Sequence, residues 1–311
     1  MNNAVPARTQ TFVEYVHSLV LSYILNPLLS LLSASITTVI NTATGTTPLD
    51  RTLARLAPPP GSSPTPAALL EVISVLAAHS PAVYASAVSS GLDNISSLLA
   101  DNGTRTTLPQ HSLLSLSLLT IAAKASLGAH VDARTQPFDE DQDAPRLNTL
   151  WTGLVPDGDG PVPPRRSPEW GRLGFQGSDP GTDFRGMGKL ALDHLVFLAE
   201  GAGGVDEHRR VVEACTQACG EPYYPWATAA INFTAFVVRS FRDGDLDGIL
   251  ARDVIAHPDG YSVPDATRLL AKIHTHVVLS FHDQWVAESP ESIMAFPAIS
   301  ARVQAHVLDS F

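Results

Sequence analysis

Apolar residues recur at helical spacing along most of this 311-residue chain, and short glycine- or proline-rich breaks separate the apolar stretches. In residues 189–200, for example, Leu192, Leu195, Val196 and Leu198 fall close to one helical face. No long run alternates strictly between apolar and polar positions, which is the pattern of a half-buried strand. The pattern therefore predicts an all-α fold of many helices.

The breaks between these stretches divide the chain into three parts. Residues 58–66 form a linker rich in Pro, Ser and Gly, which separates an apolar helical segment at 1–57 from a helical domain at 67–311. Within that domain, helices are expected at 66–78, 81–90, 92–100, 113–125, 206–218, 223–241, 268–285 and 290–308. An acidic run opening the stretch 137–157 is interpreted as solvated.

Residues 16–40 are apolar, with many Ser and Thr, and carry no Asp, Glu, Lys or Arg. A membrane-spanning helix needs about 20 mostly apolar residues, so the length suffices, but Pro27 splits the run. Three interpretations stay open: a spanning helix, a membrane-surface or hairpin anchor, or helices of the protein core. Glu14 precedes the run and no clear cleavage site follows, so no signal peptide is expected.

Charge and cysteine content narrow the classes of function. The net charge is −11 and the sequence pI is about 5.4, which argues against a general nucleic-acid binder because phosphates require a basic surface. Only Cys215 and Cys219 are present, which suggests a reducing compartment, and we expect a cytoplasmic protein. With His208 they could form a metal site, but buried thiols are the better interpretation and no metal is expected.

A second candidate metal site follows the stretch 223–241. Asp243, Asp245 and Asp247, with Gly248, match the first half of a calcium-binding loop. The twelfth position of that loop, which should be a bidentate Glu, is Val254. A solvated acidic turn is the simpler interpretation, and calcium binding stays open.

The stretch at residues 170–198 changes from a glycine-rich loop to a leucine-rich helix. At the junction Arg185 lies between Phe184 and Gly186. We expect Phe184 to be buried and to anchor the loop, and Asp183 to orient the guanidinium or to cap the helix. From the residue types alone, Arg185 would be assigned to a structural ion pair with Asp183 or Asp193.

This stretch resembles the signature of the ELMO-domain family. The family pattern is Trp, three residues, Gly-Phe-Gln, three residues, Pro, one residue, Thr-Asp-Phe-Arg-Gly, one residue, Gly and a Leu-rich helix. The matching positions here are Trp170, Gly174, Phe175, Gln176, Pro180, Thr182, Asp183, Phe184, Arg185, Gly186, Gly188, Leu192 and Leu195. One departure is Leu198, where an aromatic residue of the family is lost. Residues 224–232 and 281–285 resemble further family segments, so the resemblance extends from about residue 113 to 307.

The resemblance implies an ELMO-type helical domain with additional N-terminal helices. It also implies a GTPase-activating protein for Arf- and Arl-type small GTPases, in which Arg185 is the arginine finger. GTP and magnesium would belong to the partner, and this chain needs no cofactor of its own. The chain has no Walker A sequence, so it should not bind GTP itself.

Two alternative functions and one residue role stay open at this stage. The chain could be a non-catalytic scaffold with a DOCK-type partner, although 311 residues leave no room for the long flanking regions of such proteins. It could also be a regulator tethered to a membrane through residues 16–40. Gln176 could order the attacking water, or more simply brace the backbone. The sequence names neither the GTPase, nor the organelle, nor the oligomeric state.

Overall fold

The computed structural model describes residues 36, 38–101, 107–155, 160–257 and 260–310. These ranges are mostly helical and contain no strand, which confirms the all-α prediction. The first part of the chain forms α3 (Pro48–Leu56), α4 (Pro66–His79), α5 (Pro81–Asp101), α6 (Leu108–Arg134) and α7 (Glu140–Leu154). The second part forms η2 (Pro168–Leu173), η3 (Pro180–Gly186), α8 (Gly188–Glu200), α9 (Val205–Ala218), α10 (Trp226–Asp243), α11 (Asp247–Ala256), α12 (Val263–Glu288), η4 (Ile293–Ala295) and α13 (Phe296–Ser310).

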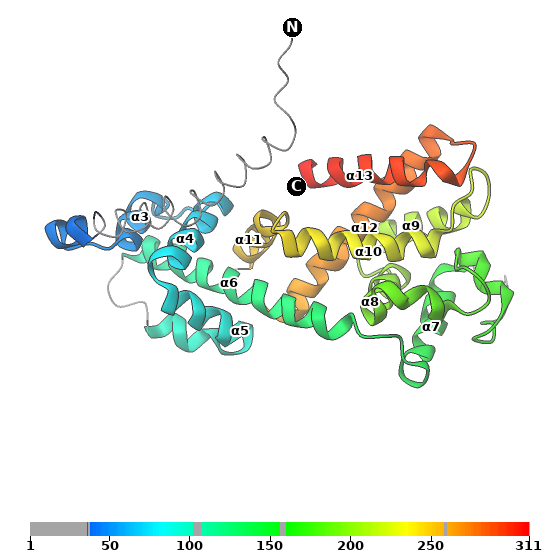
Figure 1. Ribbon diagram of the computed structural model, residues 1–311, viewed down its shortest axis with the longest axis horizontal. Helices are drawn as coiled ribbons and strands as arrows, with labels where there is room; N and C mark the ends of the chain where they lie inside the picture. The colour runs from blue at the N-terminus through cyan, green and yellow to red at the C-terminus, as the bar shows by residue number, and fades with distance from the viewer. Residues whose placement is uncertain (1–35, 37, 102–106, 156–159, 258–259, 311) are drawn as a thin grey trace, which may run out of the picture.

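Helix α6 is the longest of the described helices and connects the group of helices around α4 and α5 with the group around α8 (Figure 1). It packs against α3, α4, α5 and α11 at one end and against α8 and α12 toward the other. The sequence predicted this helix only over 113–125, ending near Gly128. The helix continues to Arg134 because Leu127 and Val131 are buried, and burial outweighs the weak helix propensity of one glycine.

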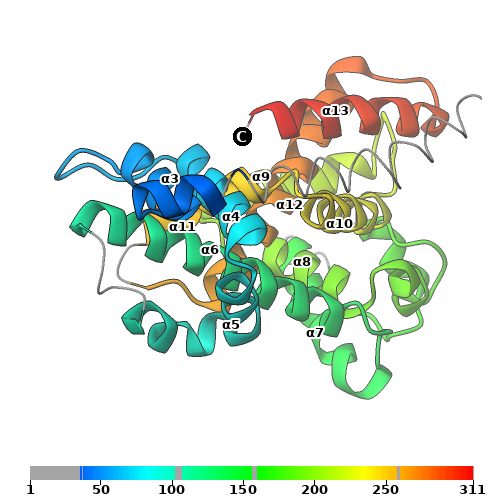
Figure 2. The ribbon, with the colours of Figure 1, turned by 60° about the vertical axis from the view of Figure 1, so that its left-hand side comes forward.

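The second half of the chain packs around α12. Helices α10 and α8 pack on it, and α13, which follows the η4 turn, crosses and packs on it as well (Figure 2). The core between these helices is aromatic: Trp226, Phe233, Phe281 and Trp285 are all 1% exposed or less. This core fixes α10 and α8, the two helices that η3 contacts.

The proline-rich linker joins helices that share one core. Helix α3, before the linker, packs on α4 and α6, and its Leu53 is only 1% exposed. Helix α5 contains a break at Gly91, where φ is +55°, and this is where the sequence predicted two separate helices. The residues on both sides of the linker therefore belong to one hydrophobic core cluster.

The acidic run at the start of α7 is not entirely solvated. Asp139 caps the helix by accepting the N–H groups of Asp141 and Gln142. Asp143 is only 4% exposed, accepts the N–H of Asp139 and lies 3.6 Å from Nζ of Lys189. The expectation of a solvated run is wrong for Asp143, because a lysine 46 positions later supplies the counter-charge.

The prediction for residues 16–40 falls almost wholly outside the described residues. Among the described helices, α6 is long and apolar enough to cross a bilayer, but 56% of its apolar window is buried inside the protein. Helix α4 and the first part of α5 pass the same test only when taken together, and they are bent by 113°. A mostly buried core helix meets these criteria equally well, so they carry little weight.

Candidate functional site

The signature loop, residues 170–188, consists of two short 3-10 helices that lead into α8. Ser167 caps η2 by accepting the N–H of Glu169, and Asp179 caps η3 by accepting the N–H of Gly181. Each helix has a proline in its first turn, where the missing N–H costs nothing. Gly174, in the left-handed conformation, ends η2, and η3 ends at Gly186 just before α8.

A chain of five rings anchors the loop to the protein core. Phe184 is fully buried and stacks on Phe138, with ring centroids 5.6 Å apart. Phe175 meets Phe184 edge-on at 5.8 Å and Trp170 at 6.0 Å, and Trp170 meets Trp151 of α7 at 5.4 Å. Edge-to-face and offset contacts of this kind stabilise beyond the area they bury. The expectation that Phe184 is buried is confirmed.

Two glycines of the loop are required by the fold. Gly174 has a φ of +82°, and a Cβ there would lie 2.2 Å from the backbone nitrogen of Trp226 at the start of α10. Gly188 has a φ of +54°, and a Cβ there would lie 1.9 Å from the carbonyl oxygen of Gln136. No other residue type avoids both the strain and the contact, so the loop is held directly against two backbone segments.

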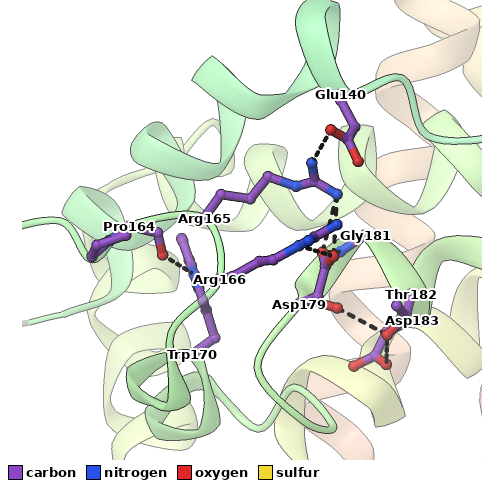
Figure 3. A network of polar contacts seen from close by, with 9 residues as sticks. All are labelled: Glu140, Pro164, Arg165, Arg166, Trp170, Asp179, Gly181, Thr182 and Asp183. Atoms are coloured by element: carbon purple, nitrogen blue, oxygen red, sulfur yellow. Dashed lines mark hydrogen bonds and ion pairs between the residues drawn. The ribbon is translucent and has the colours of Figure 1, made fainter.

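Ionic contacts hold the loop from the side facing α7 (Figure 3). Arg165 pairs with Glu140 of α7 and also donates to Asp179, 3.2 Å away. Arg166 donates to the same Asp179 carboxylate across 3.3 Å. The guanidinium of Arg165 lowers the pKa of Glu140. Asp179 thus links the η3 cap to α7, a role that the sequence pattern did not reveal.

The two turns of the loop are also joined to each other. The backbone N–H of Gln176 donates to Oδ2 of Asp183 across 2.6 Å. Partial burial raises the pKa of Asp183, although this N–H and the hydroxyl of Thr182 stabilise its ionised form. Asp183 therefore braces the loop, and it neither hydrogen-bonds Arg185 nor caps α8.

Arg185 is exposed and forms no hydrogen bond or ion pair within the described part of the chain. The structural ion pair is absent at both candidate partners. Asp183 binds the Gln176 backbone, and Asp193 is held by Arg134 and Arg146, each at 2.6 Å. The backbone around Arg185 is held by neighbouring contacts, and no described residue accepts a hydrogen bond from the guanidinium N–H groups, so these can donate to another molecule.

The remaining positions of the signature divide into supporting and exposed residues. Pro180 is buried under the loop, and exposed Thr182 donates its hydroxyl to the carbonyl oxygen of Asp179. Gly186 is exposed, has an ordinary φ, and would place a Cβ in open space. The fold therefore gives no reason for a glycine beside Arg185.

Two polar residues beside the loop, Gln176 and Asn232, have exposed side chains. Gln176 braces through its backbone, and its side chain forms no hydrogen bond in the described ranges. Asn232 is exposed on α10 and forms no hydrogen bond to any described residue.

The alternative sites suggested by the sequence do not come together among the described residues. No group of three His, Cys, Asp or Glu side chains there could hold a metal ion. His208 contacts the carbonyl oxygen of Gly153, and the Cys219 thiol donates to the carbonyl oxygen of Arg172. Cys215 is buried, as expected for a structural thiol, whereas Cys219 is exposed.

The acidic turn after α10 forms an ion pair with a lysine of α6. Asp247, the third carboxylate of the calcium-like pattern, pairs with Lys124 of α6 at 2.6 Å. A carboxylate that neutralises a lysine is a poorer calcium ligand than a free one. This contact gives Asp247 a structural role between α6 and α11.

Comparison with known proteins agrees with the position of the signature loop. The ELMO/CED-12 family profile matches residues 131–300, which include the loop, α8, α10 and α12. No solved structure matches the chain at a significant level.

Several curated proteins are similar to the chain. It is 31% identical over 163 residues to ELMO domain-containing protein B of Dictyostelium discoideum, covering 52% of this chain and 51% of that protein. It is 31% identical over 186 residues to human ELMO domain-containing protein 2, covering 59% of each. It is 29% identical over 214 residues to ELMO domain-containing protein 1 of Pongo abelii, covering 63% and 62%. The chain thus spans between about half and three fifths of these relatives, and, with more than half of it matched by the family profile, it belongs to the ELMO/CED-12 family.

Proposed function

We propose that this protein is a GTPase-activating protein for Arf- or Arl-type small GTPases, and that Arg185 is its arginine finger. The observation that carries the proposal is the state of Arg185, which is exposed and unpaired among the described residues while the residues around it are buried, capped or bonded. The family signature supplies the partner class. Nothing in this mechanism requires a cofactor of this chain.

The chemistry needs a cation that arrives from outside the GTPase. In the transition state of GTP hydrolysis, negative charge spreads over the oxygens of the transferred phosphoryl group. An arginine inserted by a partner accelerates this step by about 10³- to 10⁵-fold, which corresponds to about 4–7 kcal/mol of the barrier. Arg185 suits this role because its planar guanidinium can donate to two oxygens at once.

A finger must also be held in place before the partner arrives, because every rotation lost on binding reduces the rate gain. The buried ring of Phe184 and the bond between Gln176 and Asp183 fix the backbone on the N-terminal side of Arg185. On the C-terminal side, Gly188 is pressed against Gln136, and Lys189 donates its N–H to the same carbonyl oxygen at 3.0 Å. The backbone on both sides of Arg185 is therefore held in place, while its side chain forms no hydrogen bond to a described residue.

The test is single-turnover GTP hydrolysis over a panel of Arf and Arl GTPases, with and without this protein. We expect at least one GTPase to hydrolyse GTP about 10³-fold faster or more in the presence of the wild-type protein, and Arg185→Lys to lose most of this stimulation. If a DOCK-type protein co-purifies with the chain and no GTPase is stimulated, the scaffold interpretation replaces the proposal.

A further inference from the structure

A groove lies beside the signature loop, where Gln176 faces α10 and the η4 turn. Its volume is about 280 Å³. It is lined by Gln176, Pro225, Thr228, Ala229, Asn232, Ile293, Met294, Phe296 and Pro297. Pockets for drug-sized ligands usually begin at about 300 Å³, so this space suits an inserted side chain of a protein better than a small molecule.

The lining of the groove has the composition of a protein-contact surface. No lining residue is charged, although the chain as a whole carries a net charge of −11. Met294 is 82% exposed and Ile293 is 40% exposed at the rim. Methionine enrichment and depletion of charge are typical of the centre of protein interfaces. The side chains of Gln176 and Asn232, which form no hydrogen bond to a described residue, add hydrogen-bonding groups beside this apolar rim.

The exposed rim is held by the core beneath it. Ser292 accepts the N–H of Met294 at 3.2 Å and so caps the η4 turn. Two residues later, the ring of Phe296 packs on Phe281 and Phe233, with centroids 5.0 Å and 6.1 Å away. Met294 is therefore presented to solvent on a fixed turn, which lowers the entropy cost of burying it in a complex.

The groove lies a short backbone distance from Arg185. Gln176 lines the groove, and its backbone is bonded to Asp183, two residues before Arg185. Two residues span at most about 7 Å of backbone. A stable protein interface covers about 800 Å² on each partner, or a patch about 30 Å across, far more than one arginine side chain provides. A partner that reaches Arg185 therefore extends over neighbouring surface, and the groove is the apolar part of it.

We propose that this groove receives an apolar side chain of the same small GTPase that Arg185 acts on, with Gln176 and Asn232 bonding to the polar groups that flank that side chain. The inference rests on the proposed function for its partner. It goes beyond that function by proposing that the groove, a second site beside Arg185, contributes to the affinity for the GTPase. Arg185 supplies charge to the transition state, whereas Met294 and the groove hold the GTPase before the reaction.

The test measures affinity, so it is separate from the hydrolysis assay. GTPases of the Arf and Arl panel, locked in the GTP state by a non-hydrolysable analogue, are titrated with wild-type protein, Met294→Glu and Asn232→Ala. We expect Met294→Glu to raise the Kd of the best binder at least tenfold, because it places a charge where an apolar group is buried. We expect Asn232→Ala to raise it about three- to tenfold, the loss of one hydrogen bond.

Leu108→Glu is the matched control, because Leu108 is 87% exposed but lies at the start of α6. We expect its Kd to stay at the wild-type value. An unchanged Kd for Met294→Glu, with Arg185→Lys still slowing hydrolysis, would contradict the proposed role of the groove but not the proposed arginine finger. Equal hydrolysis rates for wild type and Arg185→Lys, with a weakened Kd for Met294→Glu, would overturn the finger alone. Binding to no GTPase overturns both, and a change only in self-association would assign the groove to a second copy.

Discussion

The backbone N–H of Gln176 and the carboxylate of Asp183 form a 2.6 Å hydrogen bond that joins the two turns of the signature loop. Asp183 is therefore engaged by the backbone of Gln176. The next residue, Phe184, is buried in the core. Arg185 follows directly and is exposed, without a hydrogen bond or ion pair to a described residue; its charge only acts on the pKa of Asp183, against the larger raising effect of burial. Three successive side chains thus have different roles: Asp183 braces the loop, Phe184 anchors it in the core, and Arg185 is exposed to solvent.

Removing the brace should loosen the loop without unfolding the protein. We expect Asp183→Ala to speed amide exchange in peptides covering residues 174–186 by about fivefold, which corresponds to about 1 kcal/mol of local opening free energy. Hydrogen–deuterium exchange followed by mass spectrometry measures this directly. Asp206→Ala removes an exposed carboxylate that pairs with Arg209 on α9 and should leave the loop peptides unchanged. Equal exchange in all three proteins would refute the bracing role.

The glycines of the signature should respond differently to the same substitution. We expect Gly174→Ala to lower the unfolding free energy by more than about 2 kcal/mol, because its new Cβ would meet the backbone of α10 at a strained φ. Gly186→Ala should change it by less than about 0.5 kcal/mol, because the site is open. Urea denaturation followed by circular dichroism compares the two.

The proposed function adds a second expectation for Gly186. If a GTPase approaches closely beside Arg185, the extra methyl group of Gly186→Ala should reduce stimulated GTP hydrolysis although the protein is as stable as wild type. Full stimulation by this variant would show that the partner does not come close to Gly186. The comparison separates glycines that the fold needs from one that the fold does not explain.

Two buried histidines should make the protein sensitive to acid. The rings of His194 and His274 lie 4.6 Å apart, and burial lowers the pKa of both, that of His274 to about 4. An unfolded histidine titrates near 6.5, so the unfolded state binds protons first as the pH falls. Stability should therefore be complete above about pH 6.5 and decline toward pH 4, by about 3 kcal/mol for His274 alone.

The contribution of His274 can be isolated by substitution, since carboxylates also titrate in the lower part of this range. We expect His274→Gln to show a shallower loss of unfolding free energy between pH 6.5 and 4.5 than wild type, measured by urea denaturation at several pH values. His79→Gln, at an exposed position near the end of α4, should follow the wild-type curve. Parallel curves for wild type and His274→Gln would contradict the neutral buried state.

Local patterns predicted much of the fold because most helices here carry their own signals. Helical spacing located α4, and the predicted gap between helices 81–90 and 92–100 falls at the Gly91 break in α5. The start of α12 was also readable, since Ser262 and Asp265 form a capping box, although we predicted that helix only from residue 268. The burial of Phe184 was predictable because it is a large apolar residue among glycines and charged residues.

Features that depend on distant segments could not be predicted in this way. Asp143 is buried because Lys189 meets it, and Asp193 is unavailable to Arg185 because Arg134 and Arg146 hold it. Asn232 belongs to a largely apolar helix, but whether its face is covered depends on the path of the η4 turn. The same turn exposes Met294, whose isolated position in the sequence gave no signal of a groove.

Single-turnover GTP hydrolysis with Arg185→Lys tests the central claim most directly. Lysine keeps the positive charge but loses the planar fork, so the variant should fold like wild type and lose most of the stimulation. Arg209→Lys, an exposed arginine on α9, is the matched control and should stimulate fully. We predict a loss of about 10³-fold or more for Arg185→Lys at saturating protein. Equal rates for Arg185→Lys, Arg209→Lys and wild type would contradict the arginine finger.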